Sequence, residues 1–172
     1  FGFRKVTIER PLRLNFQASV ERIKRVKLSK AFQNLATSRK KDEKQRQTEI
    51  ELGEATQNVI LLTLAKLPQE LFTDRDQFVS LVDDAMNEIK EETDVKISAA
   101  VRRAIIDALS ERDPKAPICI DKNGLPEADS SLRDNESIPL DYLDDEGIPS
   151  ERKVAEFFTR EVEPHVKDAW VN

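Results

Sequence analysis

The sequence predicts a mainly α fold of the α+β kind, a helical domain with a few short strands. Apolar residues recur at helical spacing through most of the chain, whereas strict alternation is confined to the first 16 residues and to short runs after residue 114. The composition, 38% hydrophobic and 35% charged, is typical of exposed amphipathic helices rather than of a thick sandwich or barrel. A chain of 172 residues is long enough to bury a core.

Residues 1–16 read as extended backbone with one buried face. Because Pro11 lacks a backbone donor, the stretch is either an edge strand or two short strands joined at Arg10-Pro11. A two-strand piece is unstable alone in water, so we expect its partners to lie elsewhere. The apolar even positions are Val6, Ile8, Leu12, Leu14 and Phe16.

Helical spacing begins after residue 16. We expect Ser19 to cap a first helix and Ser29 to start or continue it. The polar residues 37–49 form either a loop or the exposed first turns of the next helix. The side chains expected to point inward are Val20, Ile23, Val26, Phe32 and Leu35.

Three longer helices follow, over residues 49–66, 73–92 and 98–113. Pro68 ends the first and Pro114 stops the third. Thr73 with Asp76 resembles a capping box for the second, and Ser98 caps the third. The apolar sets are Ile50, Leu52, Val59, Ile60, Leu62, Leu64 and Leu67 in the first, Phe78, Leu81, Val82, Ala85, Met86 and Ile89 in the second, and Val101, Ile105, Ala108 and Leu109 in the third.

From Pro114 the composition shifts to Pro, Asp, Asn and Gly. We expect a strand at 118–120, a turn at 122–124, a second short strand at 138–140 and a helix after Ser150 that Pro164 ends. The chain therefore divides into a first strand segment (1–16), a helical region (17–113) and an irregular segment with a C-terminal helix (114–172). The apolar face of the last helix contains Val154, Phe157, Phe158 and Val162.

The charge is unevenly distributed, although the net charge is only −5. Residues 1–48 contain 14 Lys and Arg against four Asp and Glu, and the remainder is acidic. This asymmetry favours a nucleic-acid-facing surface or a charge-matched interface, and a solvated helix face is the competing interpretation. The candidate DNA or partner contacts are Arg22, Lys24, Arg25, Lys27, Arg39, Lys40, Lys41 and Lys44.

The sequence assigns no catalytic, cofactor-binding or metal-ligating residue. It has neither a Gly-x-Gly loop nor a P-loop, and the acidic stretches DKNG and DYLDDEG lack the alternating carboxylates of a calcium loop. His165 is the single histidine and has no partner group for base catalysis nearby in the sequence. Cys119, between two isoleucines, is expected to be a buried, inert thiol.

The lone cysteine excludes an internal disulfide, which fits a reducing compartment. No apolar run approaches the roughly 20 residues that cross a bilayer, and the first residues lack the design of a signal peptide. The sequence therefore predicts a cytoplasmic protein with no membrane contact.

Two stretches together resemble a known family. FGFRKVTIERPLRLNF at the start, and LRDNESIPL with VAEFFTREVEPHVKDAWV near the end, are similar to the C-terminal region of the modification (methyltransferase) subunit of type I restriction-modification systems. In that family a strand ending in Glu-Arg-Pro-Leu-Arg follows the catalytic domain, and Pro-His-Val-x-Asp-Ala-Trp lies near the end. The resemblance covers residues 1–16 and 132–171, while residues 17–131 show only a general likeness to the family.

The resemblance implies a parent protein that transfers a methyl group from S-adenosylmethionine to adenine in double-stranded DNA, together with specificity and restriction subunits. The strand at 3–10 would join or abut the sheet of the catalytic domain, and the absent initiator Met and the end at Asn172 would mark a fragment. The family's Asn-Pro-Pro-Tyr/Phe motif and its Gly-containing cofactor loop do not occur here. This fragment would then be non-catalytic and without cofactor, and would support assembly with the specificity subunit and DNA. The alternative is an independent helical adaptor or DNA-binding module without methyltransferase activity.

Overall fold

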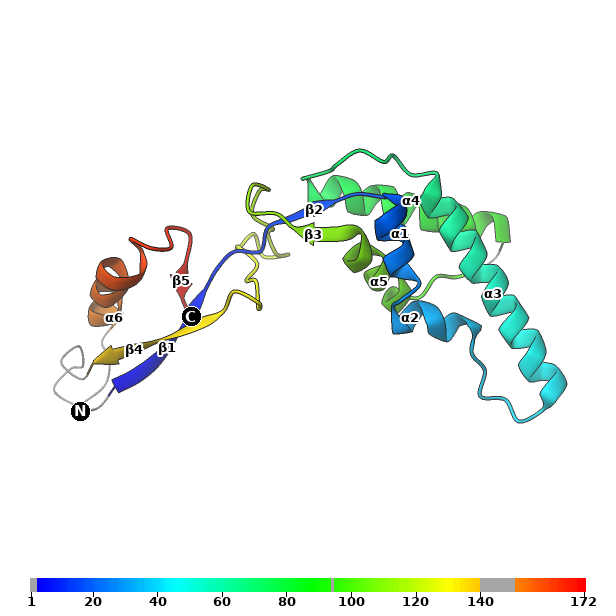
Figure 1. Cartoon of the computed structure of the whole chain (residues 1–172), viewed down its shortest axis with the longest axis horizontal. Helices are drawn as coiled ribbons and strands as arrows, with labels where there is room; N and C mark the ends of the chain where they lie inside the picture. Colours follow the sequence, from blue (N-terminus) through cyan, green and yellow to red (C-terminus); the bar gives the residue numbers. More distant parts are fainter. Residues whose placement is uncertain (1–2, 94, 140–150) are drawn as a thin grey trace. The chain divides into compact units, whose positions relative to one another are not determined.

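The computed structural model describes residues 3–93, 95–139 and 151–172 (Figure 1). The chain folds as two compact units: Phe1–Arg13 with Ile118–Asn172, which we call the strand unit, and Leu14–Pro117, which we call the helical unit. The chain leaves the strand unit after Arg13 and returns to it at Ile118, and an isolated β-bridge joins these two residues. The helical unit is therefore inserted between two parts of the strand unit.

The mainly helical fold with short strands is confirmed. Within the described ranges, no helix combines the length and the apolar content that crossing a bilayer requires. The helical unit contains β2 (Leu14–Phe16), α1 (Val20–Val26), α2 (Lys30–Gln33), the 3-10 turn η1 (Asn34–Ala36), α3 (Glu43–Ala65), α4 (Arg75–Thr93), α5 (Ala99–Leu109) and β3 (Ser110–Arg112). The strand unit contains β1 (Phe3–Glu9), β4 (Asp134–Pro139), α6 (Glu151–Phe157), the π-helical turn η3 (Phe158–Val162) and β5 (Trp170–Val171).

β1 is the middle strand of an antiparallel sheet with the order β4-β1-β5. Phe3 to Ile8 pair with β4, and Ile8 and Glu9 pair with β5. The expectation that the partners of this strand lie outside the chain is therefore wrong, because distant residues of the same chain supply them. Pro11 separates β1 from β2, which lies in the helical unit, so the two-strand interpretation of residues 1–16 is correct.

The sheet of the strand unit is covered by α6 and η3. Ile8 and Ile138 form a small core with Phe157 and Val162, and Val154 packs against its edge. Helical periodicity had placed Phe157 and Val162 on this face, and η3 ends before Pro164 as expected.

The strand predicted at 118–120 is reduced to isolated β-bridges of Ile118 and Ile120. The predicted turn that follows is present, and Gly124 adopts a φ of 80°, where a side chain would be strained. The second predicted strand forms as β4, although Leu140 and the acidic stretch DYLDDEG lie outside the described residues.

Serine caps begin three helices of the helical unit, as the sequence predicted. The hydroxyls of Ser19, Ser29 and Ser98 accept hydrogen bonds from the N–H groups three residues on. In α4 the cap is Asp74, whose Oδ1 accepts from the N–H of Gln77 at 3.0 Å, and not Thr73. A carboxylate one residue later satisfies a different free N–H group of the first turn, and sequence spacing alone does not distinguish the two caps.

Three phenylalanine rings lie at the centre of the helical unit. The ring centroid of Phe78 is 5.3 Å from that of Phe16 in β2 and 5.5 Å from that of Phe72. The other fully buried side chains of this core include Val26, Ile60, Leu64, Val82, Ile89, Ile105 and Leu109.

Several predicted inward positions are corrected. Val20, Leu52 and Leu62 are 53%, 62% and 66% exposed. The reason in α3 is a close approach of backbone: a Cβ added to Gly53 would lie 1.9 Å from a carbonyl oxygen of η1. α3 therefore turns Gly53 and Ile60 inward, and the leucines on its other side face outward.

α5 ends at Leu109 instead of continuing to Pro114. Ser110 adopts an extended backbone (φ −97°, ψ 154°), and β3 then pairs with β2 in an antiparallel ladder. The amide of Asn15 donates to Asp113 Oδ2 at 3.0 Å, which lowers the pKa of that carboxyl. Residues 110–112, which helical spacing had assigned to the preceding helix, thus pair with β2 as a strand instead.

An ion pair joins α4 to α5. Arg102 donates from Nε and Nη2 to the two carboxylate oxygens of Asp83, at 2.5 and 2.8 Å. These hydrogen bonds lower the pKa of Asp83 and raise the pKa of Arg102.

Candidate nucleic-acid interface

All eight predicted contact residues lie in the helical unit, but they do not form one surface. Arg22, Lys24, Arg25 and Lys27 are on α1 or at its end, and the other four lie between residues 39 and 44, where the chain enters α3. In the first group Arg22 and Arg25 make contacts within the fold, whereas Lys24 and Lys27 are exposed, as are all four residues of the second group.

Arg22 is a structural residue, because its side chain is only 7% exposed. Its guanidinium donates to the carbonyl of Leu109 at 2.9 Å, to Asn15 Oδ1 at 2.7 Å and to Glu111 Oε2 at 2.8 Å. These bonds tie α1 to the end of α5 and to both strands of the small sheet. Arg22 is therefore not available to DNA, and the prediction for this residue is corrected.

Arg25 shares the same carboxylate. Its Nη2 lies 3.0 Å from Glu111 Oε1, and its side chain is 40% exposed. Part of its charge is therefore compensated within the fold. Lys24 on α1 and Lys27 at its C-terminal cap are exposed.

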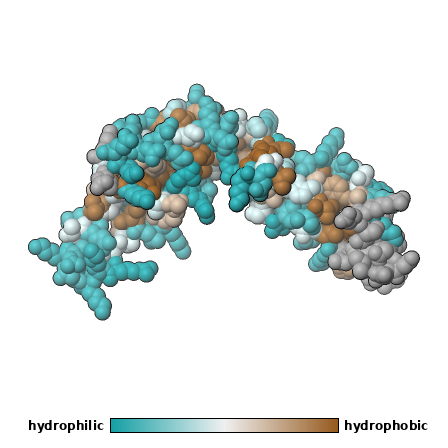
Figure 2. Space-filling model, turned by 180° about the vertical axis from the view of Figure 1, so that it is seen from behind, coloured by the Kyte–Doolittle hydropathy of each residue, from teal (hydrophilic) through white to brown (hydrophobic). Residues whose placement is uncertain are grey.

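We call Arg39, Lys40, Lys41 and Lys44 the basic cluster. All four side chains are exposed, and the surface of the loop before α3 is strongly hydrophilic (Figure 2). The polar stretch 37–49 contains both structures that the sequence allowed: a loop to Asp42, then helix from Glu43.

Hydrogen bonds hold the backbone on either side of the basic cluster. Thr37 Oγ1 donates to the carbonyl of Asn34 at 2.9 Å, and Ser38 Oγ accepts from the N–H of Lys40 at 3.2 Å. Asp42 caps α3 by accepting from the N–H of Gln45 at 2.8 Å. The cluster is thus carried on a defined loop and helix start.

The acidic side chains next to the cluster have other partners. Glu43 forms an ion pair with Arg46 one turn along α3, Glu49 accepts a hydrogen bond from Ser38, and Asp42 is the helix cap. Over the residues that the structure describes, none of the four cations of the cluster has an ion-pair partner.

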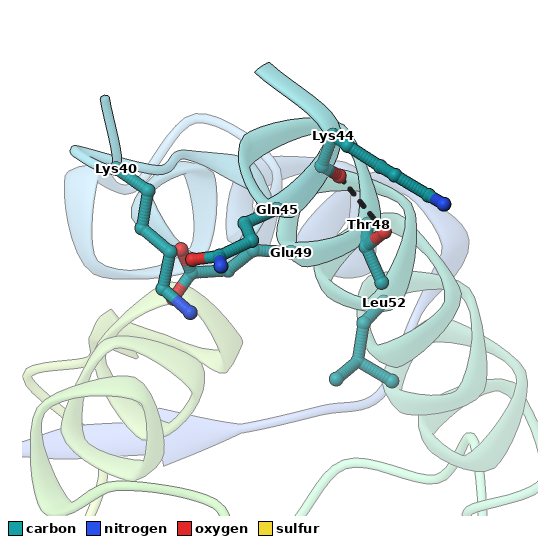
Figure 3. A pocket seen from close by; sticks show the side chains of 6 residues that line it. All are labelled: Lys40, Lys44, Gln45, Thr48, Glu49 and Leu52. Atoms are coloured by element: carbon teal, nitrogen blue, oxygen red, sulfur yellow. Dashed lines mark hydrogen bonds between the residues drawn. The ribbon is translucent and has the colours of Figure 1, made fainter. Parts of the chain in front are cut away.

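A shallow hollow of about 430 Å³ lies beside the cluster (Figure 3). Figure 3 shows Lys40 and Gln45 reaching over it beside Glu49, whereas Lys44 points away from it. The hydroxyl of Thr48 donates to the backbone carbonyl of Lys44 at 2.9 Å. The side chains that line the hollow are mostly long, polar and exposed. Such a lining suits an extended charged partner better than an enclosed small molecule. The lining residues are Lys40, Lys44, Gln45, Thr48, Glu49 and Leu52.

The sequence stretches that carry the family resemblance meet in the strand unit. Arg133 donates to Glu9 Oε1 from Nε at 2.8 Å, and its Nη2 lies 2.7 Å from the same oxygen. Arg13 Nη2 lies 3.2 Å from Asp168 Oδ2, and Glu9 is paired with Trp170 across β1 and β5. Residues more than 120 positions apart in the chain are thus direct partners.

The Glu9 carboxylate is the most buried charge of this group. Its side chain is 2% exposed, whereas that of Arg133 is 50% exposed. The hydrogen bond from Arg133 to Glu9 raises the pKa of the guanidinium. The second oxygen, Oε2, has no hydrogen-bond partner within the described residues.

The residues considered for chemistry are dispersed. His165 is exposed after η3, and Cys119 is buried, with its N–H donating to the carbonyl of Leu12 at 2.7 Å. Across residues 3–93, 95–139 and 151–172, no group of three His, Cys, Asp or Glu side chains converges as a metal site would require.

Sequence reasoning missed the internal role of Arg22. The available signal was its position four residues before buried Val26, which places both on the same helix face. Its acceptors come from β2, α5 and β3, and their meeting could not be read from local pattern.

Comparisons with protein-family models, with curated proteins and with solved structures found no match.

Proposed function

We propose that this chain is the non-catalytic C-terminal region of the modification subunit of a type I restriction-modification system, an adenine-specific DNA methyltransferase. The observation that carries the proposal is the order of three stretches that resemble that family: Glu9 to Arg13, Leu132 to Pro139, and Pro164 to Trp170. Neither helix nor strand propensity demands these residues in this order.

The contacts of these stretches support the proposal. Glu9 pairs with Arg133, and Arg13 with Asp168, so residues from all three stretches hold one small sheet and its termini together. Residues 14–117, which lie almost wholly within the part that matches only in style, form a separate unit. A division at these positions is expected if the resembling stretches form one structural element and the helices are an insertion into it.

In this proposal the parent protein binds S-adenosylmethionine and methylates adenine through residues outside this chain. The chain itself helps to hold the specificity subunit and duplex DNA, the restriction subunit joins for cleavage, and the complex is cytoplasmic.

Two observations on the gene and its product test the proposal. The full-length open reading frame should encode an Asn-Pro-Pro-Tyr/Phe motif before residue 1, and the full-length protein should copurify with a coexpressed specificity subunit. The amount of specificity subunit that copurifies is compared between two variants of the full-length protein. Arg13→Ala breaks the ion pair with Asp168 and should reduce it, whereas Lys5→Ala, which removes one exposed charge from β1, should leave it unchanged. Lack of both the motif and the copurification would reject the proposal.

The second candidate is an independent helical adaptor or DNA-binding module. It is favoured by one observation: the helical unit has its own core and carries the basic cluster. Calorimetry with S-adenosylmethionine does not distinguish the two, because neither predicts binding by this chain. The upstream motif does.

A further inference from the structure

Four cations within six residues have no ion-pair partner among the described residues, although Asp42 and Glu43 lie between them in the sequence. Arg39, Lys40 and Lys41 are consecutive and exposed, and Lys44 follows in the first turn of α3. Like charges at this spacing repel one another, and the neighbouring carboxylates have other partners within the unit. A polyanion would relieve this repulsion without disturbing any contact of the helical core.

We propose that the basic cluster binds the sugar-phosphate backbone of duplex DNA. The inference deepens the proposed function and rests on it, since it assigns the DNA contact of that assembly to one loop and one helix start. It also divides the eight predicted basic residues, because Arg22 belongs to the fold and Arg25 is partly neutralised by Glu111.

The residue types favour phosphate over other partners. Three of the four cations are lysines, which act as point charges on phosphates and do not read bases through a bidentate fork. Residues 37–52 contain no aromatic side chain, so they offer no stacking platform for single strands. An interface with an acidic protein would be expected to centre on aromatic or apolar anchors. Among the described residues that line the hollow beside the cluster, Leu52 is the only large apolar one.

The backbone adds to the positive electrostatic potential of the basic cluster. The cluster surrounds the N-terminal end of α3, which carries the positive end of the helix dipole. Asp42 uses its carboxylate on the N–H of Gln45, so this acid is held at the cap. Lys41 and Lys44, on either side of the cap, remain free to reach a phosphate.

The size of the effect follows from counterion release. Each neutralised phosphate of duplex DNA contributes about 0.9 to the slope of log K against log salt, so four contacts contribute about 3.6. A fourfold rise in salt would then weaken binding by about 150-fold through these four residues alone.

The test titrates the 172-residue chain into a labelled 30-base-pair duplex at several salt concentrations from about 20 mM upward. The variant Arg39→Ala/Lys40→Ala/Lys41→Ala/Lys44→Ala is compared with Lys66→Ala/Lys90→Ala/Lys96→Ala/Lys115→Ala. The control removes the same charge from exposed positions of the same unit. Far-ultraviolet circular dichroism checks that both variants keep their helices.

The expected result is a slope lowered by about 3.6 in the cluster variant and unchanged in the control. Equal losses in the two variants, unchanged slopes in both, or no binding by the unsubstituted chain at the lowest salt would overturn the inference. Cluster-dependent binding of polyglutamate without a change in DNA binding would assign the surface to an acidic protein instead.

The copurification with the specificity subunit separates this inference from the proposed function. An unchanged DNA slope with intact copurification rejects the DNA contact alone. Cluster-dependent DNA binding without copurification keeps the DNA contact and supports the independent DNA-binding module.

Discussion

Replacing Arg22 by Ala should unfold the helical unit at markedly lower denaturant. The buried guanidinium makes three hydrogen bonds, to a backbone carbonyl, to Asn15 and to Glu111. Hydrogen bonds to charged groups contribute about 1.5–3 kcal/mol each, but Glu111 is half exposed and keeps Arg25 as a partner. We therefore expect a net loss of about 2–4 kcal/mol, which overlaps the lower part of the range of about 3–5 kcal/mol for breaking a fully buried pair.

Urea unfolding followed by circular dichroism at 222 nm measures this loss, because most of the helix lies in the helical unit. With a slope of about 2 kcal/mol per molar urea, the midpoint should fall by about 1–2 M. Lys24→Ala, on the same helix and exposed, should change stability by no more than about 0.5 kcal/mol. A loss for Arg22→Ala as small as that of Lys24→Ala would refute the structural role of this arginine.

Three further substitutions test other parts of the fold. Gly53→Ala should destabilise the helical unit by at least about 1–3 kcal/mol in the same urea titration, because the Cβ of the alanine would lie 1.9 Å from a carbonyl oxygen of η1. A variant that is more stable than the unsubstituted chain would contradict this packing. Asp83→Asn should cost less than about 1 kcal/mol at pH 7, because the hydrogen bond from Arg102 lowers the pKa of Asp83. This contribution is present above the unfolded pKa and is lost as pH falls through the lower folded pKa, so the difference between the two proteins in the same urea titration should shrink at acid pH, and a constant difference would contradict the ion pair. Arg133→Ala should remove the ion-pair partner of the buried Glu9 carboxylate and lower the urea midpoint of the strand unit, which the fluorescence of its single tryptophan, Trp170, reports. An unchanged midpoint would show that the pair is dispensable.

The sequence predicted those features that depend on neighbouring residues. The serine caps at Ser19, Ser29 and Ser98 form as expected, because the cap bond joins residues three apart. The apolar stripes of α4 and α5 also form as expected. Pro11 lies between β1 and β2, which agrees with one of the two interpretations of the first strand segment.

Long-range contacts account for the differences. The partners of β1 lie more than 120 residues away, so the first strand read as unpartnered. Similarly, the outward position of Leu52 depends on how closely Gly53 approaches η1, which the spacing within α3 does not encode.

The candidate interface shows the same limit. Composition identified the basic third of the chain, but the separation of Arg22 from the basic cluster depends on where Asn15, Leu109 and Glu111 meet. Counting charges along a sequence cannot tell a buried guanidinium from an exposed one.

The central claim is that this chain belongs to an adenine-specific DNA methyltransferase of the type I kind. Methyl transfer by the full-length protein tests it most directly: the protein is coexpressed with its specificity subunit, incubated with duplex DNA and S-adenosylmethionine, and the DNA is digested for mass spectrometry. The account predicts N6-methyladenine in the DNA, dependent on the specificity subunit. DNA without methylated adenine, from a complex that binds S-adenosylmethionine and DNA, would contradict it.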